Sequence, residues 1–243
     1  MGFIAAIAEH SAGLADAAEG NLDAVVQHCP GWAVADLVHH LTTTHWFWAT
    51  IVEEHLSAPP AESRRPSRAS RGDLIATCRA NADRLVGTLR SADGTDPVYT
   101  WAPGQQDIAF ITRHQVQEAA VHHWDAVHAI DRDMVIAAPV AVDAIEEFLT
   151  FSVSSQTDPA DPLRPALAGQ FALHCSDTSQ AWTILDDTVP GTIAYEQGVR
   201  GDVPEIVATS SDLLLWLYQR LDFATDAASS DLVRRFRALC YTD

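Results

Sequence analysis

Lysine is absent from this chain of 243 residues, so all fifteen basic residues are arginine. Without a lysine amine the chain cannot form a Schiff base, which excludes pyridoxal-phosphate catalysis and class I aldolase mechanisms. Basic charge is scarce as well, because 33 acidic residues give a formal net charge of -18. This balance argues against nucleic acid or an anionic membrane as a partner. The arginine-only composition is typical of a GC-rich genome and fits an actinobacterial source.

Long apolar runs are also missing, and we expect no secretory leader. No run reaches the roughly 18 to 20 residues that span a bilayer. The segment Met1–Gly20 is acidic and amphipathic, without a basic n-region. The four cysteines, Cys29, Cys78, Cys175 and Cys240, contain no Cys-x-x-Cys pair, which favours buried free thiols. We therefore expect a cytoplasmic protein.

The first part of the chain has the hydrophobic period of helices. Hydrophobic residues make up 47% of the sequence, which is enough apolar material for a packed core. Apolar residues recur every three to four positions over about 3–18, 33–56, 72–90 and 107–130. With loops between them, these four helices are expected to form an up-and-down bundle. Pro139 can begin a fifth helix that ends near Val153.

In the last third of the chain the hydrophobic period shortens to two residues. Strand-like runs are expected over 170–175, 181–185, 192–195 and 205–208, and helices over 213–221 and 231–240. The segment 154–165 contains Asp-Pro twice, which is typical of a linker. We predict a helical bundle over 1–155 and a smaller α+β domain over 160–243.

The fourth predicted helix carries a stripe of ionisable residues. His114, Glu118 and His122 recur every four positions and therefore share a face, and Asp125 continues the same stripe. Apolar residues border the stripe, which favours a buried position. A carboxylate buried beside imidazoles is costly unless a divalent metal compensates it, and Asp125 could then orient a ligand. Taken alone, the spacing fits a solvated His–Glu pair equally well.

The second predicted helix offers one further candidate ligand. His40 lies on the apolar face between Leu37 and Thr44. A single histidine on such a face is more often a hydrogen-bonded core residue than a metal ligand. His39 and His45 are expected to point elsewhere, as surface or packing residues.

Two separated segments resemble the signatures of a known family. Residues 29–41, CPGWAVADLVHHL, and 117–126, QEAAVHHWDA, resemble those of the mycothiol-dependent maleylpyruvate isomerase family, a branch of the DinB-like metal-binding bundles. Residues 170–186 and 201–221 are similar to its smaller carboxy-terminal α+β domain, which is related to sterol-carrier proteins. The resemblance implies an N-terminal DinB-like up-and-down four-helix bundle with a smaller C-terminal α+β domain.

The resemblance also implies a ligand set. It assigns one divalent metal, with zinc expected, to His40, Glu118 and His122. His114, one turn before Glu118, is the alternative ligand.

Two positions beside the ligands depart from the family pattern. Gln117 stands where the family usually has histidine, and His123 where it has arginine. The metal site should survive these changes, while the surroundings of the substrate differ.

The implied reaction uses a thiol. Mycothiol, as thiolate, would add to the double bond of a cis dioxo-acid, and rotation followed by expulsion of the thiol would give the trans isomer. In the family an arginine meets a substrate carboxylate. Arg220 is the best match, and an exposed helix-end arginine beside the helix dipole is the alternative.

We therefore expect a mycothiol S-transferase or maleylpyruvate-type isomerase. Its partner would be a small electrophile or dioxo-acid, and the protein would be a monomer, with a dimer as the alternative. One competing interpretation is a hydrolase using metal-activated water, with Asp125 as general base. The other is a non-catalytic protein that binds an apolar ligand and is stabilised by its metal.

Overall fold

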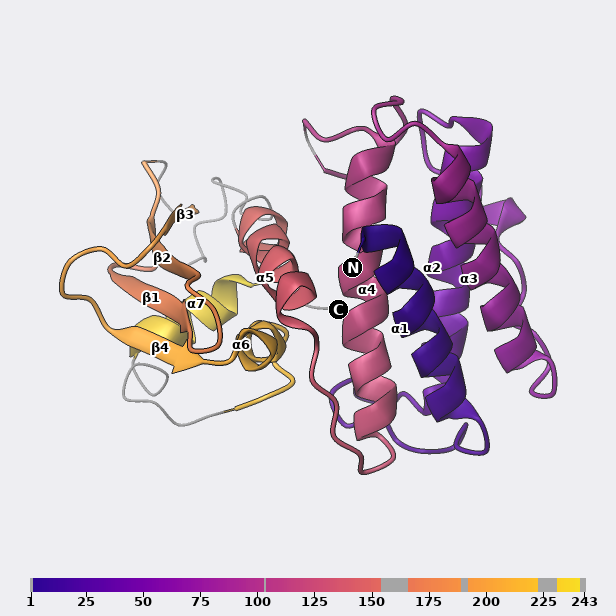
Figure 1. The fold of residues 1–243 in the computed structure, drawn as a ribbon, viewed down its shortest axis with the longest axis horizontal. Helices are drawn as coiled ribbons and strands as arrows, with labels where there is room; N and C mark the ends of the chain where they lie inside the picture. The colour runs from indigo at the N-terminus through magenta and orange to yellow at the C-terminus, as the bar shows by residue number, and fades with distance from the viewer. Residues whose placement is uncertain (1, 103, 154–165, 189–191, 223–230, 241–243) are drawn as a thin grey trace. The chain divides into compact units, whose positions relative to one another are not determined.

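The computed structural model describes residues 2–102, 104–153, 166–188, 192–222 and 231–240 (Figure 1). The chain forms two compact units, Met1–Val135 and Ile136–Asp243. The predicted fold class is confirmed, because a helical bundle is followed by a mixed sheet with helices. The predicted linker over 154–165 lies outside the described residues.

The first unit is a bundle of four long helices, which Figure 1 shows side by side. They are α1 (Phe3–Ala18), α2 (Val34–Glu54), α3 (Leu74–Ser91) and α4 (Ile108–His128), close to the predicted ranges, with a short 3-10 turn at Glu62–Arg64. The apolar stripes face one another, so that Leu14, Leu37 and Leu41 are fully buried. Asp107 caps α4, because its carboxylate accepts a hydrogen bond from the Phe110 amide at 2.8 Å.

The close approach of α1 to α4 depends on Gly13. A Cβ at this position would lie 2.2 Å from Cε1 of the His123 ring, so the ring needs the space that glycine leaves. The Nδ1 atoms of His123 and His10 are 3.1 Å apart. Burial lowers the pKa of both imidazoles, that of His123 to about 4, so one neutral ring can donate to the other.

The second unit begins with α5 (Ala138–Glu147), which has Pro139 in its first turn and continues as a π-helical segment over Phe148–Val153. The bundle expected over 1–155 would include this helix. In the structure α5 packs on α6 (Ser210–Leu217), so the units separate earlier in the chain, between Val135 and Ile136.

The four predicted strands are all present and form one sheet. They are β1 (Gln170–Cys175), β2 (Ala181–Asp186), β3 (Ile193–Gln197) and β4 (Glu205–Ala208), in the order β3-β2-β1-β4. Neighbouring strands are antiparallel except β1 and β4, which run parallel. A parallel pair needs a crossover connection, and here the chain passes through β2 and β3 between the two strands.

The core of the second unit lies between the sheet and its helices. Phe236 of α7 (Asp231–Leu239) contacts Phe171 of β1 with ring centroids 5.1 Å apart, and it stacks on Trp216 of α6. Helix α6 begins at Ser210, earlier than the predicted 213, because the Thr209 hydroxyl caps it by accepting from the Asp212 amide.

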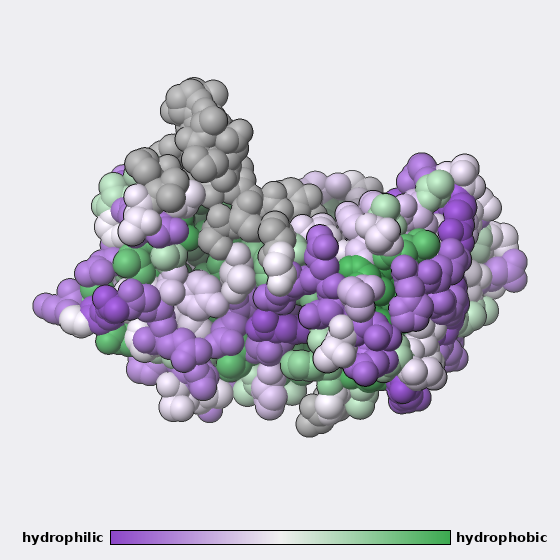
Figure 2. Space-filling view, turned by 90° about the horizontal axis from the view of Figure 1, so that it is seen from above, coloured by the Kyte–Doolittle hydropathy of each residue, from purple (hydrophilic) through white to green (hydrophobic). Residues whose placement is uncertain are grey.

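Hydrophilic residues cover much of the face drawn in Figure 2, with hydrophobic residues in small groups between them. Within the described ranges, no helix combines the length and the apolar content required to cross a bilayer.

Candidate metal centre

Helices α2 and α4 bring the three predicted ligands together. Nε2 of His40 lies 2.8 Å from Oε1 of Glu118, and Nε2 of His122 lies 3.6 Å from the same oxygen. The potential ligand atoms of the three residues all lie within 4.8 Å of one another. Two imidazole nitrogens and a carboxylate oxygen are ligands that zinc and neighbouring divalent metals accept. The three residues could therefore hold a metal ion.

The electrostatics of the site favour an anionic glutamate. Burial opposes the ionisation of Glu118, but the charges of His122 and His40 and a hydrogen bond to His40 outweigh it. The pKa of Glu118 therefore lies well below its ordinary value. The side chains of His40 and Glu118 are 28% and 13% exposed, against 6% for His122. His40 is therefore the most exposed of the three side chains.

Asp125 orients the His122 ring through the nitrogen that faces away from Glu118. Nδ1 of His122 lies 3.1 Å from Oδ2 of Asp125, which itself is almost fully buried. Because Nδ1 donates to this carboxylate, Nε2 is the ring nitrogen that faces Glu118. The thiol of Cys29 donates to the same Asp125 oxygen at 3.9 Å. Sequence reasoning did not single out this contact, although Cys29 opens the first signature segment.

The alternative ligand, His114, lies one turn away among aromatic rings. It stacks on Phe110 with centroids 5.7 Å apart, and its edge meets Trp48 and Trp101. Its Nδ1 accepts a hydrogen bond from Nε2 of Gln117 at 3.3 Å. The helical stripe was predicted correctly, but His114 does not belong to the group of converging ligand atoms.

The remaining candidates have different surroundings. His39 is half-buried beside Arg68, whereas His45 is fully buried in the packing between helices, which is one of the two positions expected for it. In the second unit, Nη1 of Arg220 donates to the Tyr218 carbonyl at 2.8 Å, just beyond the end of α6. Its guanidinium carbon lies 5.8 Å from the centroid of the Tyr218 ring. The catalytic assignment of Arg220 stays a prediction.

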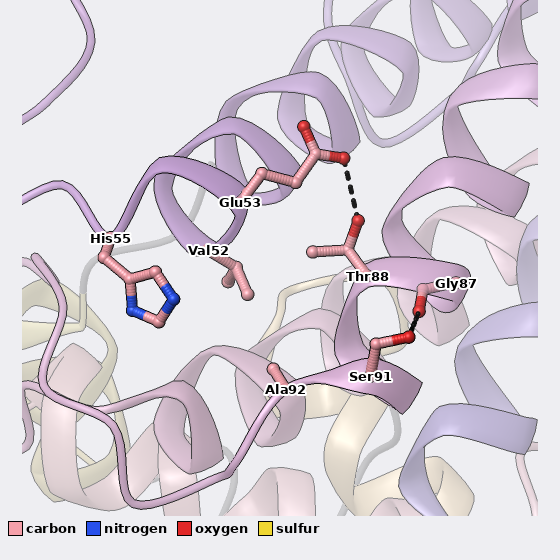
Figure 3. Close-up of a pocket in the computed structure, with 7 residues that line it drawn as sticks. All are labelled: Val52, Glu53, His55, Gly87, Thr88, Ser91 and Ala92. Atoms are coloured by element: carbon pink, nitrogen blue, oxygen red, sulfur yellow. Dashed lines mark hydrogen bonds between the residues drawn. The ribbon is translucent and has the colours of Figure 1, made fainter.

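A cavity elsewhere in the bundle contains none of these residues. It has a volume of about 400 Å³ and lies where α2 and α3 end (Figure 3), lined by Val52, Glu53, His55, Gly87, Thr88, Ser91 and Ala92. Its one carboxylate, on Glu53, is engaged by Arg84 and by the Thr88 hydroxyl, whose bond is 2.8 Å long. These bonds lower the pKa of Glu53 despite partial burial, so it is a poor general base.

Three side chains that could ligate a metal converge from two helices of a four-helix bundle, an architecture in which metal sites are built from facing helices. The family described as "Mycothiol maleylpyruvate isomerase N-terminal domain" matches residues 3–127, which include all three ligands. The chain belongs to this family. No curated protein and no solved structure matches the chain.

Proposed function

We propose that this protein is a metal-dependent enzyme that activates a low-molecular-weight thiol, mycothiol, for addition to a small electrophile. The observation that carries the proposal is the convergence of His40, Glu118 and His122 within a domain of the mycothiol maleylpyruvate isomerase family. The reaction is either S-transfer or cis–trans isomerisation of the maleylpyruvate type. We further propose a cytoplasmic monomer that acts without nucleic acid or membrane.

The residues fit a divalent metal, with zinc as the first candidate. Three protein ligands leave a coordination position open, and the buried pair of His122 and Asp125 provides the outer hydrogen bond that metal-binding histidines usually have. When bound, such a cation supplies a position at which a thiol loses its proton at neutral pH. Glu118 keeps its charge there, because its pKa is held low.

Asp125 supports thiol chemistry over hydrolysis. A hydrolase needs a general base that is free to take a proton from water. Oδ2 of Asp125 already accepts from His122 and lies within reach of the Cys29 thiol, and the residue is only 1% exposed. This arrangement suits an orienting residue better than a base.

In the isomerase reaction the thiolate would form a carbon–sulfur bond while the double bond of the cis dioxo-acid becomes an enolate. Rotation about the resulting single bond and cleavage of the carbon–sulfur bond would restore the double bond as trans and release the thiolate. Arg220 is our candidate for binding the substrate carboxylate, because a guanidinium matches a carboxylate with two parallel hydrogen bonds. In an S-transferase the carbon–sulfur bond would instead be retained.

The test compares metal content and thiol binding in matched variants. His122→Ala should lose nearly all bound metal, whereas His39→Ala, which alters a half-buried histidine next to the ligand His40 on α2, should retain it. In the cobalt-substituted protein, addition of mycothiol or its cysteinyl-glucosamine fragment should produce an intense sulfur-to-cobalt band in the near ultraviolet. The band should be absent from the His122→Ala protein.

Equal metal content in the two variants would refute the ligand assignment. Intact metal binding without a thiol band, together with metal-dependent hydrolysis of simple esters or amides, would replace the thiol proposal with a hydrolase. Intact metal binding without turnover of any thiol, ester or amide substrate would favour a non-catalytic ligand-binding protein.

A further inference from the structure

The two helices that carry the ligands are also joined by a second, dry polar contact. Nδ1 of His45 on α2 lies 2.9 Å from Oε1 of Gln115 on α4, and Nε2 of His45 lies 2.9 Å from Oγ of Ser11 on α1. An amide oxygen only accepts, so Nδ1 donates to Gln115 and Nε2 accepts the Ser11 hydroxyl proton. We call these three residues the Ser11–His45–Gln115 brace.

The brace is buried and uncharged. His45 and Gln115 are 0% exposed and Ser11 is 2% exposed, and burial lowers the pKa of His45 to about 4. A serine bonded to an imidazole resembles the nucleophile–base pair of hydrolases. Here, however, the hydroxyl is bonded to His45 and enclosed by the surrounding helices, so a substrate cannot reach it. The role of the brace is therefore structural or positional.

The position of the brace links it to the metal ligands. His45 follows His40 by five residues on α2, and Gln115 precedes Glu118 by three on α4. At 1.5 Å per residue these offsets correspond to about 7.5 Å and about 4.5 Å along the helix axes. The His45–Gln115 bond and the His40–Glu118 contact thus cross the same pair of helices about one turn apart.

Packing alone constrains this pair of helices weakly. Helix α4 packs mainly on α1, and α2 packs mainly on α3. Two directional contacts at neighbouring levels can fix both the separation of α2 and α4 and their rotation, which apolar packing sets less sharply. We infer that the Ser11–His45–Gln115 brace is a positioning device that holds His40 in register with Glu118 and His122. This inference rests on the proposed metal site.

The experiment separates metal affinity from fold stability. Zinc affinity is measured by chelator competition, and the thermal midpoint of the metal-free protein is measured alongside. Gln115→Leu should weaken zinc binding at least tenfold, which is the usual effect of losing a residue that supports a metal ligand. The matched control is Leu85→Ala, which opens the core on α3, a helix without metal ligands; it should lower the midpoint without changing zinc affinity.

A double variant provides the sharper comparison. His45→Leu with Gln115→Leu replaces both partners by apolar groups. The thermal midpoint of this double variant should therefore be closer to that of the wild type than the midpoint of Gln115→Leu is. Zinc affinity should stay weak, because an apolar contact does not restore the direction of the hydrogen bond. If Gln115→Leu fails to fold, Ser11→Ala gives a milder variant that should still weaken zinc binding about threefold.

Wild-type zinc affinity in Gln115→Leu, or in Ser11→Ala where that variant is used, overturns the inference. Full recovery of affinity in the double variant also overturns it. These failures are distinct from failure of the proposed function, in which the wild-type protein itself binds no zinc through His40, Glu118 and His122. That result removes the site and the positioning role together.

Discussion

Two histidines on α2, five residues apart, meet α4 at nearly the same distance. His40 lies 2.8 Å from Glu118, and His45 lies 2.9 Å from Gln115. The first contact is partly exposed and has a second imidazole beside it, whereas the second is dry and ends in a hydroxyl. The two contacts therefore share their helices but not their chemistry.

The difference bears on which of the two histidines could accept a metal. A carboxylate partner leaves negative charge that a cation can neutralise, and partial exposure lets the cation enter. An amide and a hydroxyl satisfy both ring nitrogens of a neutral imidazole and leave neither for a metal. The residue opposite the histidine decides its role more than its position on the apolar face does.

Replacing the carboxylate of the His40–Glu118 contact by an amide, as in the His45–Gln115 contact, should have the largest effect. Glu118→Gln keeps the shape but removes the anionic ligand, so zinc affinity should fall at least 100-fold. The metal-free protein should keep a thermal midpoint close to that of the wild type, because the amide can still bond to His40. Calorimetric titration of zinc and thermal unfolding with chelator check the two parts. Undiminished zinc affinity would show that the carboxylate is not a ligand.

Lowering the pH should reveal the buried His45–Gln115 contact through a loss of stability. His45 has a pKa of about 4 in the fold and about 6.5 when unfolded. Above pH 6.5 it is neutral in both states, but between about 6.5 and 4 the unfolded chain binds a proton that the fold excludes. The free energy of unfolding of the metal-free protein should therefore fall by up to roughly 3 kcal/mol over this window.

Denaturant titrations at several pH values, with chelator present, measure the slope of the free energy of unfolding against pH. His45→Gln should reduce the slope, and the remainder should reflect the other buried imidazoles with lowered pKa, those of His10 and His123. An unchanged slope in His45→Gln would mean that the brace does not hold His45 neutral.

The reverse exchange should give a smaller, local effect. Gln115→Glu places a carboxylate against Nδ1 of His45, and a nearby opposite charge favours the imidazolium. The pKa of His45 should rise from about 4 by at least one unit, against the effect of burial. Titration of the His45 ring protons by nuclear magnetic resonance measures the change. A pKa that stays near 4 would contradict the decisive role given to the partner.

The smallest expected effect is at the outer edge of the site. Cys29→Ala removes the thiol that donates to Asp125 at 3.9 Å, while the His122–Asp125 bond remains. A thiol is a weak donor, so zinc affinity should fall only about two- to threefold. Chelator competition resolves such a change. A loss as large as that of Glu118→Gln would assign Cys29 a direct part in metal binding.

How far the sequence could predict the site follows from the same contrast. Glu118 and His122 were accessible to periodicity, because four residues make one turn and the helix alone brings them together. His40 required the family resemblance, since its approach to α4 is a tertiary contact. Gln115 and Ser11 carry no charge and no diagnostic spacing, so the brace was not predicted.

The elements of the fold were predicted more fully than their grouping. The bundle helices and the strands have clear periods, so their ranges lie close to the observed ones. The assignment of α5 to the second unit depends on its packing against α6, which local sequence does not encode. The start of α6 lies before the predicted residue 213 because Thr209 supplies the cap.

Gly13 has a consequence for how this chain can diverge. Its missing side chain is the space that the His123 ring occupies, so the two positions form one steric unit across α1 and α4. Substitution of either residue alone leaves a clash or a void, and compensated pairs avoid both. Positions 13 and 123 should therefore covary among homologous sequences, with larger residues at 13 accompanied by smaller or differently directed side chains at 123.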